Sequence, residues 1–161
     1  MIGVIALSLA ASTALPPCPA AALSLATDAE GGACDGMSQS GTLLVVRNIG
    51  PSACSVPGLP RLTMHDAHGK ALPITHKTPI GMHPGPVVLP VGVAPGAELT
   101  TRLHWVSGPV YDRNRCYDVK GVSVTIDGTA IRAALSGHIC GNAASRVTFD
   151  QPILQPDPRL D

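Results

Sequence analysis

The sequence predicts an all-β protein, an antiparallel β-sandwich of about eight or nine strands joined by tight turns. The first observation is that 17 glycines and 16 prolines among 161 residues interrupt almost every stretch of ten. The second is that apolar and polar residues alternate in the short runs between them, which is typical of half-buried strands. The third is that no long helical periodicity follows the N-terminal apolar run. These observations favour one small, turn-rich domain over residues 15–151.

Residues 1–14 are expected to be a cleaved signal peptide. They carry no charge, and the apolar run 2–11 is too short to span a bilayer as a retained helix. Thr13 and Ala14 belong to a small-residue stretch that suits a signal-peptidase site. No Lys or Arg precedes the run, so the natural start can lie upstream, and a buried N-terminal strand or helix is the alternative. We expect a periplasmic or extracellular chain with no transmembrane span after cleavage. Pro17 disfavours a lipid anchor at Cys18.

Five cysteines predict disulfides, because exported chains meet an oxidising compartment. Asp127-Gly128 is a strong hairpin signal between two alternating runs. With a three-residue loop after Ile126 and no bulge, Cys116 lies opposite Cys140. A bridge between them closes a loop of about 25 residues, worth about 3–4 kcal/mol in the loop-entropy description.

A second pair, Cys18 with Cys54, rests on a weaker argument. Cys18 precedes an expected strand at 21–26 and Cys54 follows another at 42–48, so antiparallel pairing of these strands brings the cysteines together. Cys34 is left over in a glycine-rich loop. It can be a free thiol, a dimer crosslink, or the true partner of Cys18 or Cys54. No C-x-x-C motif occurs, which argues against a thioredoxin-like motif or a zinc knuckle.

The remaining elements follow from the same patterning. Residues 43–46 are apolar on both faces and indicate a central strand. Residues 99–105 alternate, which places Leu99, Thr101, Leu103 and Trp105 on one face. We expect a core that includes Trp105, Leu103, Val45 and Val124. The other expected elements are strands at 61–65, 70–75, 87–89 and 146–149, loops at 76–86 and 107–115, and a loose proline-rich tail at 152–161.

Composition and motifs argue against several function classes. Eleven basic and eleven acidic residues cancel, and a nucleic-acid binder normally shows a basic excess. The run 36–41 only approaches the G-x-S-x-G nucleophile motif, because Ser40 stands where the second Gly belongs. The acidic residues are scattered, with no pair that resembles a glycosidase dyad. We expect no enzyme and no cofactor.

One alternative is a periplasmic copper-binding protein, because thioether and imidazole ligands suit copper. Adjacent strand residues such as Met64 and His65 point to opposite faces, so both can bind one ion only at a bulge. No H-x-M or H-x-H spacing occurs, and solvated turn histidines are the simpler interpretation. The candidate ligands are Met64, His65, His68, Met82 and His83.

Several short motifs occur in a recognisable order. They are Leu-Leu-Val-Val-Arg-Asn-Ile-Gly at 43–50, a C-x-x-x-G-x-P turn at 54–60, Ala-Pro-Gly at 94–96, and the late cysteines Cys116 and Cys140. In this order the chain resembles the domain-of-unknown-function 4232 family of secreted bacterial proteins over about residues 18–148. The resemblance implies an Ig-like sandwich outside the cytoplasm, disulfide-stabilised, with no established catalytic residues. Cys34 is a fifth cysteine, outside the four-cysteine pattern that the resemblance implies.

Two further expectations concern Asn48 with Gly50, and Trp105. Asn48 and Gly50 are expected to adopt positive φ in a turn that ends a strand. Trp105 is expected to pack against a disulfide, by analogy with immunoglobulin domains. The functional hypothesis is a non-enzymatic bacterial binding module of the cell envelope. It would recognise an unknown protein or envelope ligand through edge strands or the loops 76–86 and 106–115.

Overall fold

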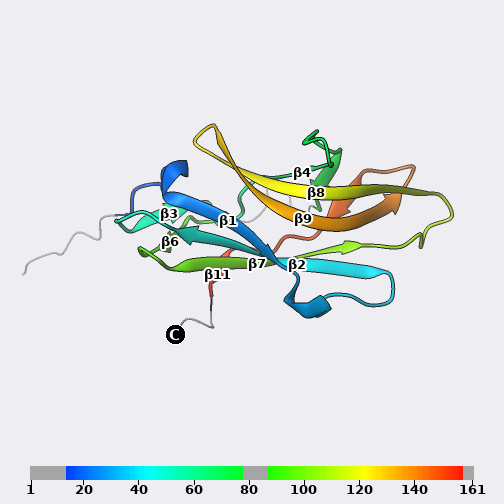
Figure 1. Cartoon of the computed structure of the whole chain (residues 1–161), viewed down its shortest axis with the longest axis horizontal. Helices are drawn as coiled ribbons and strands as arrows, with labels where there is room; N and C mark the ends of the chain where they lie inside the picture. Colours follow the sequence, from blue (N-terminus) through cyan, green and yellow to red (C-terminus); the bar gives the residue numbers. More distant parts are fainter. Residues whose placement is uncertain (1–13, 78–86, 158–161) are drawn as a thin grey trace, which may run out of the picture.

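The computed structural model describes residues 14–77 and 87–157 and has the expected all-β architecture (Figure 1). Residues 1–13 of the expected signal peptide lie outside the described residues. The only helical segments within the described ranges are two 3₁₀ turns, η1 (Ala20–Ala22) and η2 (Glu30–Gly32). The strands are β1 (Leu23–Asp28), β2 (Gln39–Asn48), β3 (Cys54–Val56), β4 (Leu62–His65), β5 (Ile74–His76), β6 (Val91–Val93), β7 (Glu98–Val106), β8 (Asn114–Ile126), β9 (Thr129–Asn142), β10 (Val147–Phe149) and β11 (Gln155–Pro156).

Two main sheets form the layers of the sandwich. One sheet has the strand order β1-β2-β7-β11, and the other has the order β4-β8-β9. Two short ladders, β3–β6 and β5–β10, complete the described strands. The pairing is antiparallel as expected, except that β10 pairs with β5 in parallel.

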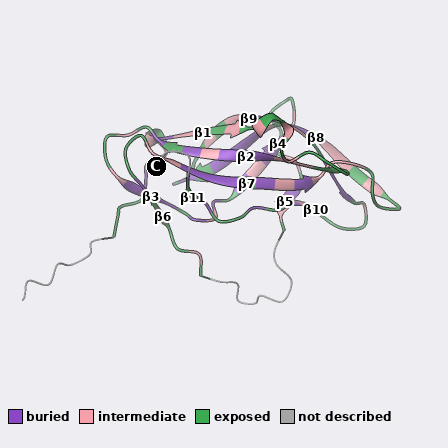
Figure 2. Cartoon of the chain, turned by 90° about the horizontal axis from the view of Figure 1, so that it is seen from below, coloured by how far each residue is buried: buried purple, intermediate pink, exposed green. Residues whose placement is uncertain are grey.

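The core lies between the two layers, and Figure 2 shows its buried residues along β2 and β7. Leu103 and Trp105 of β7 and Val124 of β8 are buried in it, as predicted. Val45 is only half-buried, so its assignment to the core was wrong. The strand at 43–46 is central, but Leu44 and Val46 are its core residues, and the pleat turns Val45 to the outer face.

The β8–β9 hairpin forms the predicted Cys116–Cys140 disulfide by a different register from the one expected. Its turn has two residues, because Ile126 pairs with Thr129. A bulge between Val119 and Gly121 then places two β9 residues opposite one on β8. The shorter turn and the bulge offset each other, so Cys116 still pairs with Cys140.

The bulge lies where the two sheets meet along one edge. Thr27 of β1 donates a hydrogen bond of 2.7 Å from its Oγ1 to the carbonyl of Ala134, just before the bulge on β9. Bulges bend a strand and increase its local twist. The bend therefore coincides with the edge where β9 meets β1.

The C-terminal segment corrects a second expectation, since residues 152–157 are packed and not a loose tail. Leu154 is 1% exposed, and its N–H donates to the carbonyl of Gly58. β11 pairs with β7, and Asp150 forms an isolated bridge with His104 of the same strand. The domain therefore continues beyond residue 151. Residues 158–161 lie outside the described residues.

Two expected strands between β4 and β6 differ in the structure. Residues 87–89 form no strand, and Val87 and Leu89 are exposed. The strand begins instead at Val91, where it pairs with β3. The return strand expected at 70–75 is reduced to one bridge between Ala71 and His65, followed by β5.

Candidate functional site

The motifs at 43–50, 54–60 and 94–96 meet at one end of the sandwich, around Asn48. This side chain is fully buried, and its Nδ2 donates to the carbonyls of Ser52 at 2.9 Å and Val93 at 3.1 Å. Its Oδ1 accepts the N–H of Gly50 at 2.9 Å. Its backbone bonds to Gly96 and Ala97 of the Ala-Pro-Gly turn. Asn48 therefore ties three chain segments together.

The positive φ expected at Asn48 and Gly50 is not observed, because neither residue adopts it. Gly50 is small for another reason: a Cβ there would lie 2.8 Å from the Cβ of Ala22. The predicted Cys18–Cys54 disulfide is formed beside this cluster, with Cys54 Sγ 3.6 Å from Asn48 Nδ2. We conclude that this part of the motif frame builds the fold and offers no reactive group.

The histidines and methionines of the copper alternative are not assembled into a site among the described residues. Met64 is fully buried in the core. Both ring nitrogens of His65 have partners, the carbonyl of Gly69 at 3.2 Å and Ser123 Oγ at 2.8 Å. His68 is exposed in the turn that follows. Met82 and His83 lie outside the described residues.

That turn is organised by Asp66. Its Oδ1 accepts the backbone N–H groups of His68 at 2.8 Å and Lys70 at 2.9 Å. The hydrogen bond from Lys70 is the main reason that the pKa of Asp66 lies below its ordinary value. The Asp66 carboxylate therefore stabilises the turn that follows β4. This structural role accounts for Asp66 without a bound ligand.

Cys34 is the one cysteine without a disulfide, and it lies on the outer face of the β2–β7 sheet. Its Cβ and His104 Nδ1 both approach Gly41, where a Cβ would lie 2.9 Å and 3.2 Å from them. Cys34 is half-buried. Because Cys18 and Cys54 are bonded to each other, Cys34 is not the partner of either, and the free thiol and the dimer crosslink are the alternatives that stay open.

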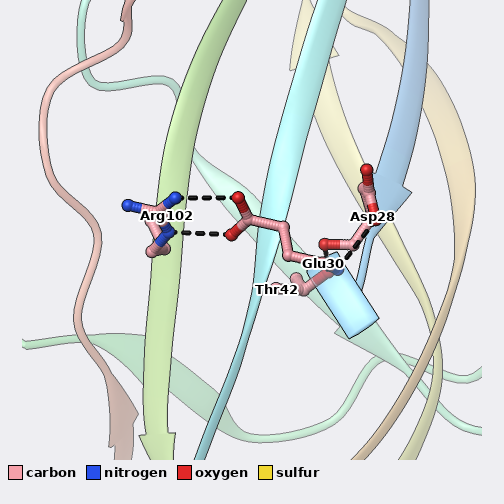
Figure 3. A network of polar contacts seen from close by, with 4 residues as sticks. All are labelled: Asp28, Glu30, Thr42 and Arg102. Atoms are coloured by element: carbon pink, nitrogen blue, oxygen red, sulfur yellow. Dashed lines mark hydrogen bonds and ion pairs between the residues drawn. The ribbon is translucent and has the colours of Figure 1, made fainter. Parts of the chain in front are cut away.

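The loop that carries Cys34 is attached to the sheet by an ion pair (Figure 3). Glu30 accepts hydrogen bonds from Arg102 Nε and Nη2, both at 2.8 Å, and this contact raises the pKa of Arg102. Asp28 Oδ1 accepts the N–H of Glu30 at 2.7 Å, and Thr42 donates to the Asp28 carbonyl at 3.0 Å. This pair could not be predicted from patterning, because its members are 72 residues apart.

Trp105 is buried as expected, but it does not pack against a disulfide. Its ring lies over Gly137 of β9, 3.0 Å from where a Cβ would be. Alternation along β9 places Gly137 and Ile139 on the core face, and His138 and Cys140 on the opposite face. The Cys116–Cys140 disulfide is thus on the outside of its sheet, and the Cys18–Cys54 disulfide is at the far end of the sandwich from Trp105.

The end opposite the Asn48 cluster presents exposed side chains on ordered loops. We call this surface the loop end, made of Met37, Val110, Tyr111, Arg113 and Arg146, all exposed. Met37 is 99% exposed at the tip of the turn before β2, and Tyr111 and Val110 lie in the loop between β7 and β8. Figure 1 shows these loops at the same end of the molecule.

Hydrogen bonds hold the loops of the loop end together. The N–H of Ser107 donates to the Ser38 carbonyl at 2.8 Å, which joins the Met37 turn to the loop after β7. Asn114 bonds to both backbone groups of Tyr111, accepting its N–H at 3.1 Å. The N–H of Ala143 donates to the Arg113 carbonyl at 3.0 Å. The exposed side chains therefore project from a fixed backbone.

Comparison with known proteins agrees with the sequence motifs. Within the described residues no helix is long and apolar enough to cross a membrane. No curated protein and no solved structure gives a significant match. The family model described as "Domain of unknown function (DUF4232)" matches residues 18–152, which include the Asn48 cluster, both disulfides and the loop end. The chain therefore belongs to the domain-of-unknown-function 4232 family.

Proposed function

We propose that this protein is a non-enzymatic, exported binding module of the bacterial cell envelope that contacts its partner through the loop end. The observation that carries the proposal is the grouping of exposed Met37, Val110 and Tyr111 with Arg113 and Arg146 on hydrogen-bonded loops. Tyr, Met and Arg are the residue types enriched at protein interfaces. An ordered backbone also lowers the conformational entropy lost on binding.

The absence of an enzyme is supported by the roles of the polar residues. Among the described residues, His65, Asn48, Asp66 and Glu30 are each bonded to groups that maintain the fold. A recess of about 410 Å³ between β4 and β5 is lined by apolar Leu62, Leu72 and Ile74 and by polar Thr63, Thr75 and His76. Gln151 borders this recess, and its amide already donates to the Pro60 carbonyl.

Export is supported by the two disulfides and by the apolar N-terminal run of the sequence. Disulfides of this kind are typical of proteins that leave a reducing cytosol. The net charge of zero disfavours a nucleic acid as the partner.

Site-specific photo-crosslinking tests the binding surface. A photoreactive residue at position 37 or 111, in cells that export the full chain, is expected to give a discrete protein adduct. The same residue at Thr129, exposed in β9 near the hairpin turn, serves as the control and is expected to give none. Purified wild-type protein should compete for the adduct, whereas a Tyr111→Ala/Arg113→Ala variant should not.

Two results contradict the proposal. One is the absence of adducts from positions 37 and 111 when the protein is exported and folded. The other is turnover of a substrate by the purified protein that a single polar substitution abolishes, which would make it an enzyme.

A further inference from the structure

Four side chains capable of binding a metal project from one face of the β8–β9 hairpin. Cys116 pairs with Cys140, and Asp118 pairs with His138. Residues two apart on a strand share a face, so Cys-x-Asp on β8 and His-x-Cys on β9 present all four side chains together. This is the outer face of the sheet, away from the core and from Trp105.

The distances within this cluster are short. One ligand atom from each of Cys116, His138 and Cys140 lies within 4.8 Å of the other two. Asp118 Oδ1 is 2.7 Å from His138 Nδ1, which fixes the orientation of the imidazole. The side chains of His138 and Asp118 are 50% and 78% exposed, Cys116 is half-buried and Cys140 is buried, so an ion would enter the cluster from the side of His138. In the oxidised chain the two sulfurs are bonded to each other and are not thiolate ligands.

We propose that reduction of the Cys116–Cys140 disulfide converts this face of the hairpin into a Zn²⁺ site. Cys116, Cys140 and His138 are the ligands, and Asp118 is the positioning residue that orients the imidazole. Two thiolates and one imidazole suit zinc, and a three-ligand set leaves the fourth position for water. A carboxylate that hydrogen-bonds to the second nitrogen of a ligating histidine is the usual outer partner of such sites.

The reduction and the binding step both balance. Two molecules of a thiol reductant each lose one electron and one proton and become a disulfide, and Cys116 and Cys140 become two thiols. Binding of Zn²⁺ then releases both thiol protons, because the thiolate is the ligand. Twelve cross-strand residue pairs join β8 and β9, so we expect the hairpin to hold the ligands in place once the disulfide is open. Zinc therefore binds the reduced chain only and opposes its reoxidation.

Cobalt substitution tests the site in the full chain. A Cys34→Ser variant removes the unpaired thiol, so that every remaining thiolate comes from a disulfide pair. The protein is reduced anaerobically with a dithiol, the reductant is removed, and alkylation with peptide mapping identifies the free cysteines. Titration with Co²⁺ is expected to give a thiolate-to-cobalt absorption band at one equivalent, which Zn²⁺ abolishes. The oxidised protein is expected to give no band.

Three substitutions define the ligands. His138→Ala is expected to weaken cobalt and zinc binding by about tenfold or more, and Asp118→Asn by a smaller factor. His68→Ala, an exposed histidine in another turn, is expected to leave binding unchanged.

Several outcomes overturn the proposal. They are the absence of a thiolate band in the reduced protein, a band that His138→Ala leaves unchanged, and unfolding on reduction as seen by circular dichroism. Opening of Cys18–Cys54 before Cys116–Cys140 also overturns it. None of these outcomes bears on the loop end, which is a separate surface.

Discussion

Asn48 stabilises the fold through more bonds than its position at the end of a strand predicts. A strand-ending asparagine suggests a turn, and a positive φ was the natural expectation. The structure instead gives it a buried role, with its amide bonded to Ser52, Val93 and Gly50. These partners come from different segments, so a single sequence could not reveal them.

Replacement of Asn48 is therefore expected to be costly. Asn48→Ala removes the partner of the buried Val93 carbonyl and of two part-buried groups, the Ser52 carbonyl and the Gly50 N–H, and an unpaired buried group costs about 1–3 kcal/mol. We expect the free energy of unfolding to fall by at least about 2 kcal/mol, measured by chemical denaturation. Asn142→Ala, an exposed asparagine that accepts one bond from Ala144, is the control and should cost less than about 1 kcal/mol. Equal losses in the two variants contradict the role assigned to Asn48.

Asp66 gives a prediction about pH. Its pKa in the folded chain lies below the ordinary value of 3.8, so its contribution to stability is fully present above that pH. The contribution is lost as the pH falls through the lower pKa of the folded state. We expect Asp66→Asn to be less stable than the wild type at neutral pH, and the difference to shrink in acid. Thermal unfolding across the acidic range measures this, and a constant difference contradicts it.

The β8–β9 hairpin shows how far patterning specifies an element. Alternation and Asp127-Gly128 correctly predicted two long antiparallel strands and the pairing of Cys116 with Cys140. The turn length and the bulge were not predicted. A longer turn without a bulge and a shorter turn with one give the same pairing at the cysteines, so the cysteine spacing does not distinguish them. Asp127 and Gly128 adopt φ of 47° and 75°, as a two-residue hairpin turn requires. The position of the bulge is explained only by a contact between the sheets, because Thr27 of β1 bonds to the Ala134 carbonyl just before it.

The C-terminal segment shows the opposite case, since its composition was misleading. Prolines at 152 and 156 suggested a loose tail, because proline cannot donate to a ladder. β11 nevertheless pairs with β7 at the sheet edge, where proline is tolerated, and Leu154 enters the core. The sequence analysis missed this packing because a single leucine among prolines forms no alternating apolar pattern from which a strand could be predicted.

Leu154 therefore provides a direct test of this segment. Leu154→Ala is expected to lower the free energy of unfolding by about 2–5 kcal/mol, as for other buried leucines. The neighbouring Ile153 is 46% exposed, so Ile153→Ala is the matched control and should cost clearly less. Urea denaturation of both variants measures the difference. Similar small losses would mean that the segment is not packed as described.

At the scale of the molecule, the two ends of the sandwich have different tasks. One end holds the Asn48 cluster and the Cys18–Cys54 disulfide, and the other holds the loop end. The fold class and both disulfides could be predicted from strand patterning and cysteine spacing. The loop end could not, because the Met37 turn and the loop after β7 are joined by a bond between distant segments, from Ser107 to Ser38. The chemical identity of a surface depends on such contacts between distant segments.

The two disulfides are expected to differ in their ease of reduction. Cys140 is 2% exposed, much like Cys18 and Cys54 at 2% and 4%, but its partner Cys116 is only half-buried and offers a sulfur to attack. Thiol–disulfide exchange requires access of the attacking thiolate. Limited treatment with a thiol reductant should open Cys116–Cys140 first, measured by timed alkylation and mass spectrometry. Simultaneous opening of the two bridges contradicts this order.

The position of the last strands has a consequence for how the protein is made. β7 is flanked on one side by residues from Asp150 to Pro156, so the four-stranded sheet lacks its final edge until these residues have been synthesised. Residues 14–149 therefore emerge from the ribosome before the sandwich can be completed. Late closure of this kind suits the export that we propose, because an unfinished sandwich can still be threaded through a translocation channel.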